Sequence, residues 1–319
     1  MIRFLVRRVL QGLLVIWLIT LVLFATFYIA PSNVAQTLGG RQATPQTIAL
    51  INQRLGLDRP LYEQYLSFVG NALRGDLGYD YYKQIPVTSI IADAAPKTLS
   101  IAIGAAILWL LIGVTNGVLS ATRPRSFLDR SLTVFALFFY SMPTFLLGLL
   151  LLFFLYFQLT LAGIKIFPAG GYVDLSTSVG GWLQHMILPW ITVALVSAAI
   201  YTRLTRTSML EVLSEDYIRT ARSKGLSERR VVLRHGLRSG LTPVVTQFGI
   251  DIAGLVGGVI VTEQVFSIDG LGRTSVMAIT QQDQPVIIGI ALLGTVAVVV
   301  ANILVDVAYA FLDPRVRLN

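Results

Sequence analysis

Residues 98–121 read TLSIAIGAAILWLLIGVTNGVLSA, a stretch of 24 residues without an Asp, Glu, Lys or Arg. A helix of about 20 apolar residues crosses the roughly 30 Å hydrocarbon core of a bilayer. In lipid the backbone must satisfy its own hydrogen bonds, so a long apolar run becomes a helix. This stretch therefore predicts a membrane-spanning helix.

Five further apolar runs are each long enough to span, and composition agrees with them. Of 319 residues, 55% are hydrophobic and 13% charged, whereas a soluble domain has about 25% charged residues. The first run is longer than the core of a cleaved signal peptide, the alternative for a basic start, and no small-x-small site follows it. We expect an all-α integral membrane protein with six transmembrane helices, at residues 9–30, 98–121, 131–157, 186–203, 241–262 and 286–312.

The charges between the spans predict their orientation. Segments 1–8, 122–130, 204–240 and 313–319 hold 16 Lys and Arg residues, and the much longer alternate set holds eight. The excess of positive charge marks the cytoplasmic side. Both termini are therefore expected in the cytoplasm, with the chain in the cytoplasmic (inner) membrane. Topology accounts for the basic excess without a nucleic-acid partner.

The expected organisation has four parts. They are an N-terminus with the first span (1–30), an extracytoplasmic domain (31–97), a core of five spans (98–312) and a cytoplasmic tail (313–319). In the extracytoplasmic domain, Thr44 and Pro45 predict a helix start and Gly56 its end. This domain either caps the outer mouth of the protein or docks an external partner, and the sequence favours neither.

Within the core, residues 204–240 predict a cytoplasmic hairpin of two short helices. Ser214 is the expected N-cap of the first helix, and Gly225 fits its left-handed end. Ser227 then caps the second, with Leu226 and Val231 as a hydrophobic staple. One interpretation is an amphipathic hairpin on the anionic inner leaflet. The first helix has no row of bulky apolar anchors, which favours a helix presented to a cytoplasmic partner.

The stretch EDYIRTARSKGL, residues 215–226, resembles the EAA loop of ABC-importer permeases. Followed by RHGLRSGLTPVV, it is similar to the dipeptide/oligopeptide branch of that family. YSMPTF at 140–145 and TEQVFSIDGLGR at 262–273 fit the same branch. Arg219 stands where the general motif has Glu, Thr220 replaces its first Ala, and Arg238 replaces a Pro. The peptide branch shows the same changes.

This resemblance implies an importer of several subunits. It would contain a second permease subunit, related but different, two ABC ATPase domains that bind ATP and Mg, and an extracytoplasmic substrate-binding protein. The chain itself would be no enzyme and bind no cofactor or metal; a P-loop needs Gly-Lys-Ser/Thr, and Gly-Lys does not occur here. The resemblance implies alternating access, with the EAA helix coupled to the ATPase. The residues expected at that contact are Tyr217, Arg219, Ala221, Lys224, Gly225 and Leu226.

Two acidic residues lie within the predicted spans, where charge is costly and therefore a functional candidate. Asp251 is near the centre of the fifth span and Asp306 is in the sixth. Asp251 is interpreted as part of a water-lined pathway, and Asp306 as a partner in an interhelical hydrogen bond or an ion pair with Arg203 or Arg206. Gly254 and Gly258 form a small-xxx-small pattern for close helix packing.

Two alternatives to the ABC permease belong to other classes of protein. The first is a secondary transporter that uses Asp251 and Asp306 as ion carriers, although no internal repeat supports it. The second is a membrane-anchored scaffold, against which the intramembrane aspartates argue. The resembling family imports dipeptides, longer peptides, glutathione and nickel.

Overall fold

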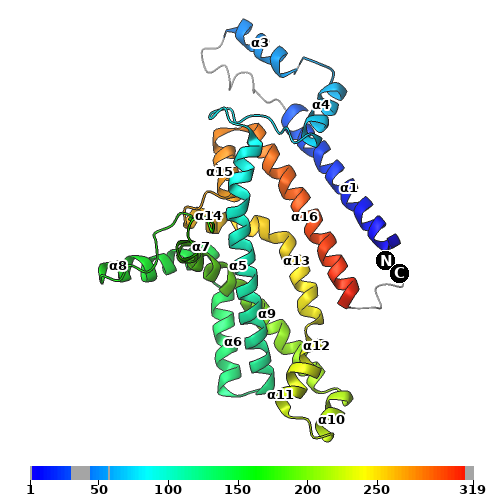
Figure 1. The fold of residues 1–319 in the computed structure, drawn as a ribbon, viewed down its shortest axis with the longest axis vertical. Coiled ribbons are helices and arrows are strands. Elements are labelled where there is room, and N and C mark those ends of the chain that lie inside the picture. The colour runs from blue at the N-terminus through cyan, green and yellow to red at the C-terminus, as the bar shows by residue number, and fades with distance from the viewer. Residues whose placement is uncertain (1, 30–43, 57, 313–319) are drawn as a thin grey trace. The chain divides into compact units, whose positions relative to one another are not determined.

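The computed structural model describes residues 2–29, 44–56 and 58–312, and it is built from helices (Figure 1). Within these ranges the one extended pairing is an isolated bridge between Tyr79 and Pro86. The predicted all-helical class is therefore confirmed. Three stretches, labelled η, are π-helical. In chain order the helices are α1 (Ile2–Phe24), η1 (Ala25–Ile29), α3 (Pro45–Leu55), α4 (Leu61–Leu73), α5 (Val87–Thr122), α6 (Phe127–Tyr140), α7 (Thr144–Leu151), η2 (Leu152–Gln158), α8 (Leu159–Leu161), α9 (Val179–Leu213), α10 (Asp216–Ser223), α11 (Glu228–Arg230), η3 (Val231–Gly236), α12 (Leu237–Gly240), α13 (Thr242–Gly258), α14 (Ile260–Val265), α15 (Leu271–Gln281) and α16 (Gln284–Leu312).

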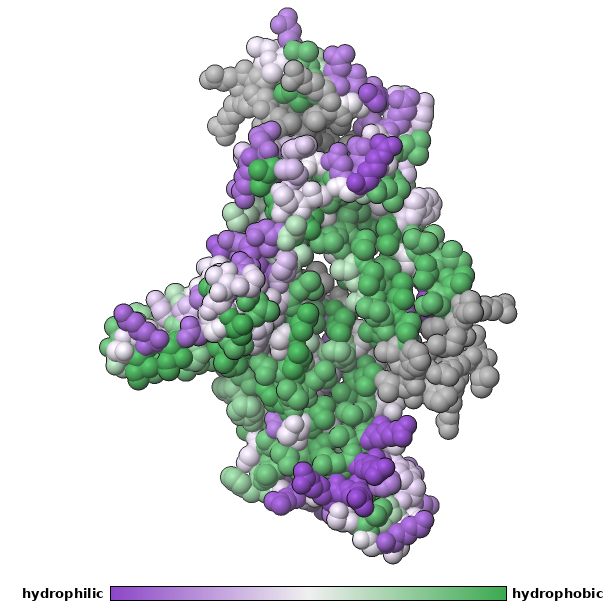
Figure 2. Space-filling model, in the orientation of Figure 1, coloured by the Kyte–Doolittle hydropathy of each residue, from purple (hydrophilic) through white to green (hydrophobic). Residues whose placement is uncertain are grey.

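Five helical stretches of the described chain are long and apolar enough to cross a membrane. They are Leu5–Phe27, Val87–Thr122, Thr144–Leu161, Val179–Leu213 and Gln284–Val307. Large apolar side chains remain exposed along them, and Figure 2 shows this apolar surface in green. An exposed apolar surface of this kind is what a lipid-facing helix presents. The chain is thus a multi-pass helical membrane protein.

The third and fifth predicted spans differ from the structure. The third is divided, because α6 ends at Tyr140 and α7 begins at Thr144. Pro143 has extended backbone angles and no N–H to donate, which interrupts the helix. The fifth predicted span, residues 241–262, is not one continuous helix: α13 has 17 residues and is followed by the separate helix α14. Six spans therefore remain a prediction.

The chain divides into two compact units, of which one comprises residues 1–94 and 274–303. In this unit α1 packs on α4, because Phe24 contacts the rings of Tyr65 and Phe68 and Thr20 hydrogen-bonds the Tyr65 hydroxyl at 2.9 Å. Helix α3 begins and ends as predicted. Its N-cap Thr44 accepts from the Thr47 amide.

The second unit comprises residues 95–273 and 304–319. Its core lies where α5 packs on α9, around buried Trp109 and Tyr201. Gly113 and Gly117 allow the close approach, since a Cβ at either would lie 2.4 Å from a Cβ of α9. The small-xxx-small packing that the structure describes in this unit is therefore on α5. Gly254 of the predicted pair is exposed, and a Cβ there would meet no atom within 4 Å; the surroundings of Gly258 lie outside the described residues.

Candidate functional site: the α9–α10 hairpin and the polar residues of the spans

The predicted hairpin follows directly from α9. Helix α9 ends at Leu213, and α10 begins at Asp216 after a break of two residues. Ser214 is not the N-cap as predicted. Its hydroxyl donates to the Glu211 carbonyl at 2.6 Å at the end of α9, and Glu215 occupies the N-cap position in an extended conformation. The cap prediction was wrong because α9 continues ten residues beyond the predicted fourth span.

The inner side of the hairpin is apolar and closed. Ile218 and Val231 are fully buried, Ala221 is 7% exposed, and Leu213 and Leu226 pack against them. The predicted staple of Leu226 and Val231 is therefore present. Ala221 allows the two arms of the hairpin to approach each other. Among the six residues predicted at the ATPase contact, Ala221 and Leu226 thus face their own hairpin.

The outer side of α10 is open to solvent. Tyr217, Arg219, Lys224 and Gly225 are all exposed. Gly225 has φ +75°, the left-handed conformation predicted for the end of this helix, and a Cβ there would meet nothing within 4 Å. Figure 2 shows hydrophilic side chains gathered over this end of the unit. We refer to these four exposed residues together as the α10 outer face.

An ion pair closes the corner between the two arms. The Arg222 guanidinium donates to Glu228 through Nε at 3.1 Å and through a terminal nitrogen at 2.7 Å. These hydrogen bonds from Arg222 lower the pKa of the Glu228 carboxyl. Both side chains are exposed, so the pair contributes about 0.2–1 kcal/mol. Sequence reasoning missed it, because residues six apart do not face each other on one continuous helix.

A buried carboxylate joins α5, α6 and α9 at the predicted cytoplasmic end of the unit. Asp129, which is 4% exposed, accepts from Arg206 Nε at 2.7 Å and from a second guanidinium nitrogen at 2.9 Å. It also accepts from the Ser120 hydroxyl and from the Arg125 amide. The Arg206 hydrogen bonds hold the pKa of Asp129 well below its usual range, against the opposing effect of burial. Arg206 thus pairs with Asp129.

Asp251 takes part in a hydrogen bond between two helices. The Tyr201 hydroxyl of α9 donates to Oδ2 at 2.8 Å, and Gln247 donates to Oδ1 at 2.9 Å. Its place in a water-lined pathway stays a prediction. Asp306 is partly buried on α16, and α16 contacts α13 closely, since a Cβ on Gly249 would lie 2.2 Å from Val305.

The motif at 262–273 folds around one buried acid. Glu263, with no exposed surface, accepts from the Thr98 hydroxyl at 2.6 Å and from the Arg273 amide at 2.8 Å. The Thr98 hydroxyl in turn accepts from the Leu271 amide at 2.8 Å. A Cβ on Gly270 would lie 2.3 Å from the Glu263 carboxylate. The acid, the hydroxyl and the glycine together fix the turn before α15.

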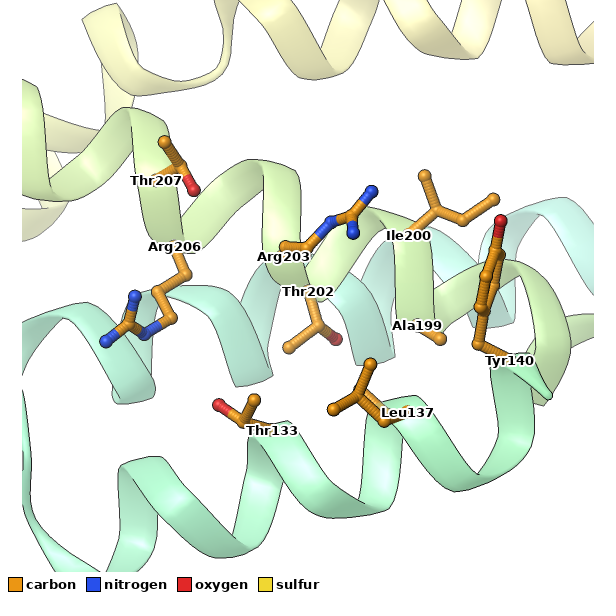
Figure 3. A pocket seen from close by; sticks show the side chains of 10 residues that line it. Thr133, Leu137, Tyr140, Ala199, Ile200, Thr202, Arg203, Arg206 and Thr207 are labelled. Carbon is orange, nitrogen blue, oxygen red and sulfur yellow. The ribbon is translucent and has the colours of Figure 1, made fainter.

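A pocket of about 390 Å³ lies between α6 and α9. Figure 3 shows Thr133, Leu137 and Tyr140 on the α6 side, and Arg203 and Arg206 on α9 with their guanidinium groups directed away from each other. Arg206 is paired with Asp129, whereas no acceptor among the described residues binds the exposed Arg203 guanidinium. From the sequence, Arg203 is placed at the end of the fourth span and considered as an ion-pair partner of Asp306; among the described residues it has no such partner.

Long apolar helices with a small, exposed and charged hairpin define a multi-pass helical membrane protein. Residues 113–318 match the family model for "Binding-protein-dependent transport system inner membrane component", and residues 1–102 match the N-terminal model of the same membrane component. The chain belongs to this family of binding-protein-dependent transport system inner membrane components. It is an ABC-importer permease of the peptide type, and this membership favours the ATP-driven interpretation over the ion-driven one.

Relatives of full length support the assignment. The chain is 36% identical over 314 residues to "Probable peptide ABC transporter permease protein y4tP" of Sinorhizobium fredii, covering 98% of this chain and 99% of the relative. It is 37% identical over 317 residues to the oligopeptide transport system permease protein AppB of Bacillus subtilis, with 98% and 99% covered. It is 36% identical over 318 residues to the glutathione transport system permease protein GsiC of Escherichia coli K12, with 99% of each covered.

Solved structures support the fold. The inward-facing MetNI methionine ABC transporter matches with a TM-score of 0.53 at 20% identity, covering 70% of this chain and 96% of that one. An amino acid ABC transporter matches with a TM-score of 0.51 at 16% identity, covering 70% and 94%. The permease fold thus accounts for most of the chain.

Proposed function

We propose that this chain is one permease subunit of an ATP-driven importer of short peptides, and that it works by alternating access. Peptides reach it from an extracytoplasmic substrate-binding protein. A second, related but different permease subunit completes the pathway, and two partner ATPase domains bind ATP and Mg. The names of the relatives, which include peptide, oligopeptide and glutathione permeases, support this substrate class.

The observation that carries the proposal is the construction of the hairpin. Its apolar residues Ile218, Ala221 and Val231 are buried against one another. The hairpin therefore keeps its fold without a partner. Its α10 outer face is left exposed. Because α9 runs into α10 with a break of two residues, a push on the α10 outer face moves α9. This is the connection that coupling to a cytoplasmic ATPase requires.

The orientation is part of the proposal. The basic hairpin lies in the cytoplasm with both termini, and residues 31–97 lie outside. The described part of that outer segment presents exposed Leu66 and Leu73 on α4. Apolar side chains in a water-exposed segment favour a docking role for it.

Gly225 provides the experiment. A Cβ at this position points into open space, so Gly225→Arg places bulk where a partner would sit and not inside the chain. Gly225→Asn is the matched control, since Asn tolerates the left-handed conformation and is smaller. In the complete complex reconstituted into sealed proteoliposomes, Gly225→Arg should leave the permease inserted but abolish peptide uptake and peptide-stimulated ATP hydrolysis. Gly225→Asn should retain both.

Retained uptake in Gly225→Arg would count against the coupling role. A chain that is purified repeatedly without an ATPase would count against the importer itself.

A further inference from the structure

The pocket between α6 and α9 has a mixed lining of hydroxyl-bearing and apolar side chains. On α6, Thr133, Ala136, Leu137 and Tyr140 line it. These positions are three or four residues apart and therefore share one face of the helix. Val134 and Phe138, on other faces, are strongly exposed. The pocket side therefore offers hydroxyl groups beside apolar surface, which fits an amphipathic ligand such as a short peptide, whereas the Val134 and Phe138 side offers apolar surface alone.

The pocket carries one positive charge that the protein does not neutralise. The charge of Arg206 is neutralised by Asp129, to which Arg206 donates two hydrogen bonds. Arg203 remains exposed, and the described residues offer its guanidinium no acceptor. Arg203 lies at the end of the predicted fourth span, where a cation without an acceptor in the protein needs water or an anionic partner. An anionic ligand would neutralise the positive charge of Arg203.

We infer that the α6–α9 pocket is a subsite for the terminal carboxylate of the peptide in transit, held by Arg203. This inference rests on the proposed function and adds a contact with the substrate. A guanidinium donates two parallel hydrogen bonds to a carboxylate, and this geometry is specific to that group. A carboxylate is common to all short peptides whatever their side chains. A site that binds the terminal carboxylate can therefore accept peptides of different sequence.

The chain has no cysteine, which permits a direct test by labelling. Ala136→Cys places a thiol in the pocket with little added bulk, and Val134→Cys places one on the other side of α6. The complete complex is reconstituted in nanodiscs and treated with an anionic or a cationic methanethiosulfonate reagent. The pocket thiol should react, and Arg203 should favour the anionic reagent by about tenfold. The Val134→Cys thiol should stay unreactive.

A dipeptide with a free carboxylate should slow labelling of Ala136→Cys, and its C-terminal amide should not. Arg203→Gln should remove both the protection and the preference for the anionic reagent. Arg130→Gln is the matched control, because Arg130 is an exposed cation at the start of α6 that does not line the pocket. It should leave both effects unchanged.

Equal protection by the amide, or protection that survives Arg203→Gln, would overturn the inference. Protection that follows the content of phosphatidylglycerol in the nanodisc and not the peptide would assign the site to a lipid headgroup and also overturn it. ATP hydrolysis stimulated by peptide-loaded binding protein is measured in parallel. If that stimulation is present and the protection is absent, the subsite fails while the proposed function stands.

Discussion

Arg206 on α9 holds Asp129 on α6 through two hydrogen bonds, Nε to Oδ1 at 2.7 Å and a terminal nitrogen to Oδ2 at 2.9 Å. The same carboxylate accepts from Ser120 on α5. One buried side chain therefore fastens three helices together, two turns before α9 ends and α10 begins. This is where a displacement of the hairpin would pass from α9 to its neighbours.

Removing either member of this pair should lower the stability of the unit and weaken the coupling between peptide transport and ATP hydrolysis. Arg206→Ala leaves a buried carboxylate without its main donor, at a cost of about 2–4 kcal/mol. We expect a lower melting temperature and ATP hydrolysis that no longer responds to peptide. The double variant Asp129→Leu/Arg206→Met should recover much of the stability, because an apolar pair of similar volume needs no charge partner. If it also recovered peptide-stimulated hydrolysis, the pair would serve stability alone.

A buried and an exposed residue of α10 should respond differently to the same substitution. Ala221→Asp places a charge among Ile218 and Val231 and should unfold the hairpin, so its amides exchange rapidly with deuterium. Tyr217→Asp changes an exposed side chain, so the hairpin amides should stay protected while ATPase binding weakens. Deuterium exchange and co-purification of the ATPase measure the two effects. Strong binding in Tyr217→Asp would remove this face from the contact.

The sequence predicted the helical membrane class, the α3 caps and the left-handed Gly225, because each depends on local pattern. Apolar run length and a glycine at a helix end act within a few residues. It did not predict that Ala221 faces inward, since burial of a small side chain depends on the second arm of the hairpin. The Asp129–Arg206 pair could not be predicted from the sequence either. Its members are 77 residues apart, and no local pattern joins them.

The turn before α15 should depend on the absence of a side chain at Gly270. Gly270→Ala would bring a Cβ to 2.3 Å from the Glu263 carboxylate, which must then move and release Thr98 or Arg273. We expect a loss of about 1–3 kcal/mol and faster deuterium exchange at the Leu271 and Arg273 amides. Gly180→Ala is the control, because Gly180, like Gly270, has no positive φ, and a Cβ on it would meet nothing within 4 Å. Unchanged exchange in Gly270→Ala would show that Glu263 does not organise the turn.

Asp283 should make the corner before α16 sensitive to pH. Burial raises the pKa of its carboxyl, the neighbouring Asp80 adds to the effect, and hydrogen bonds from the Tyr81 and Val286 amides oppose it. An acid with a raised folded pKa binds more protons in the folded state, so stability falls as pH rises from its unfolded pKa, near 3.9, through the folded one. The Tyr81 amide, which donates to Asp283 at 2.9 Å, reports on this corner. Its deuterium exchange, corrected for the intrinsic pH dependence, should become faster across that window.

Asp283→Asn should remove this dependence, because an amide keeps an acceptor for Tyr81 and carries no charge to bury. Asp58→Asn is the control for loss of an exposed acid in the same unit, and it should leave the pH dependence in place. Equal pH dependence with and without the Asp283 carboxyl would assign the titration to another group. A flat profile in Asp283→Asn together with protected Tyr81 would show that the corner is held by the hydrogen bond and loosened by the charge.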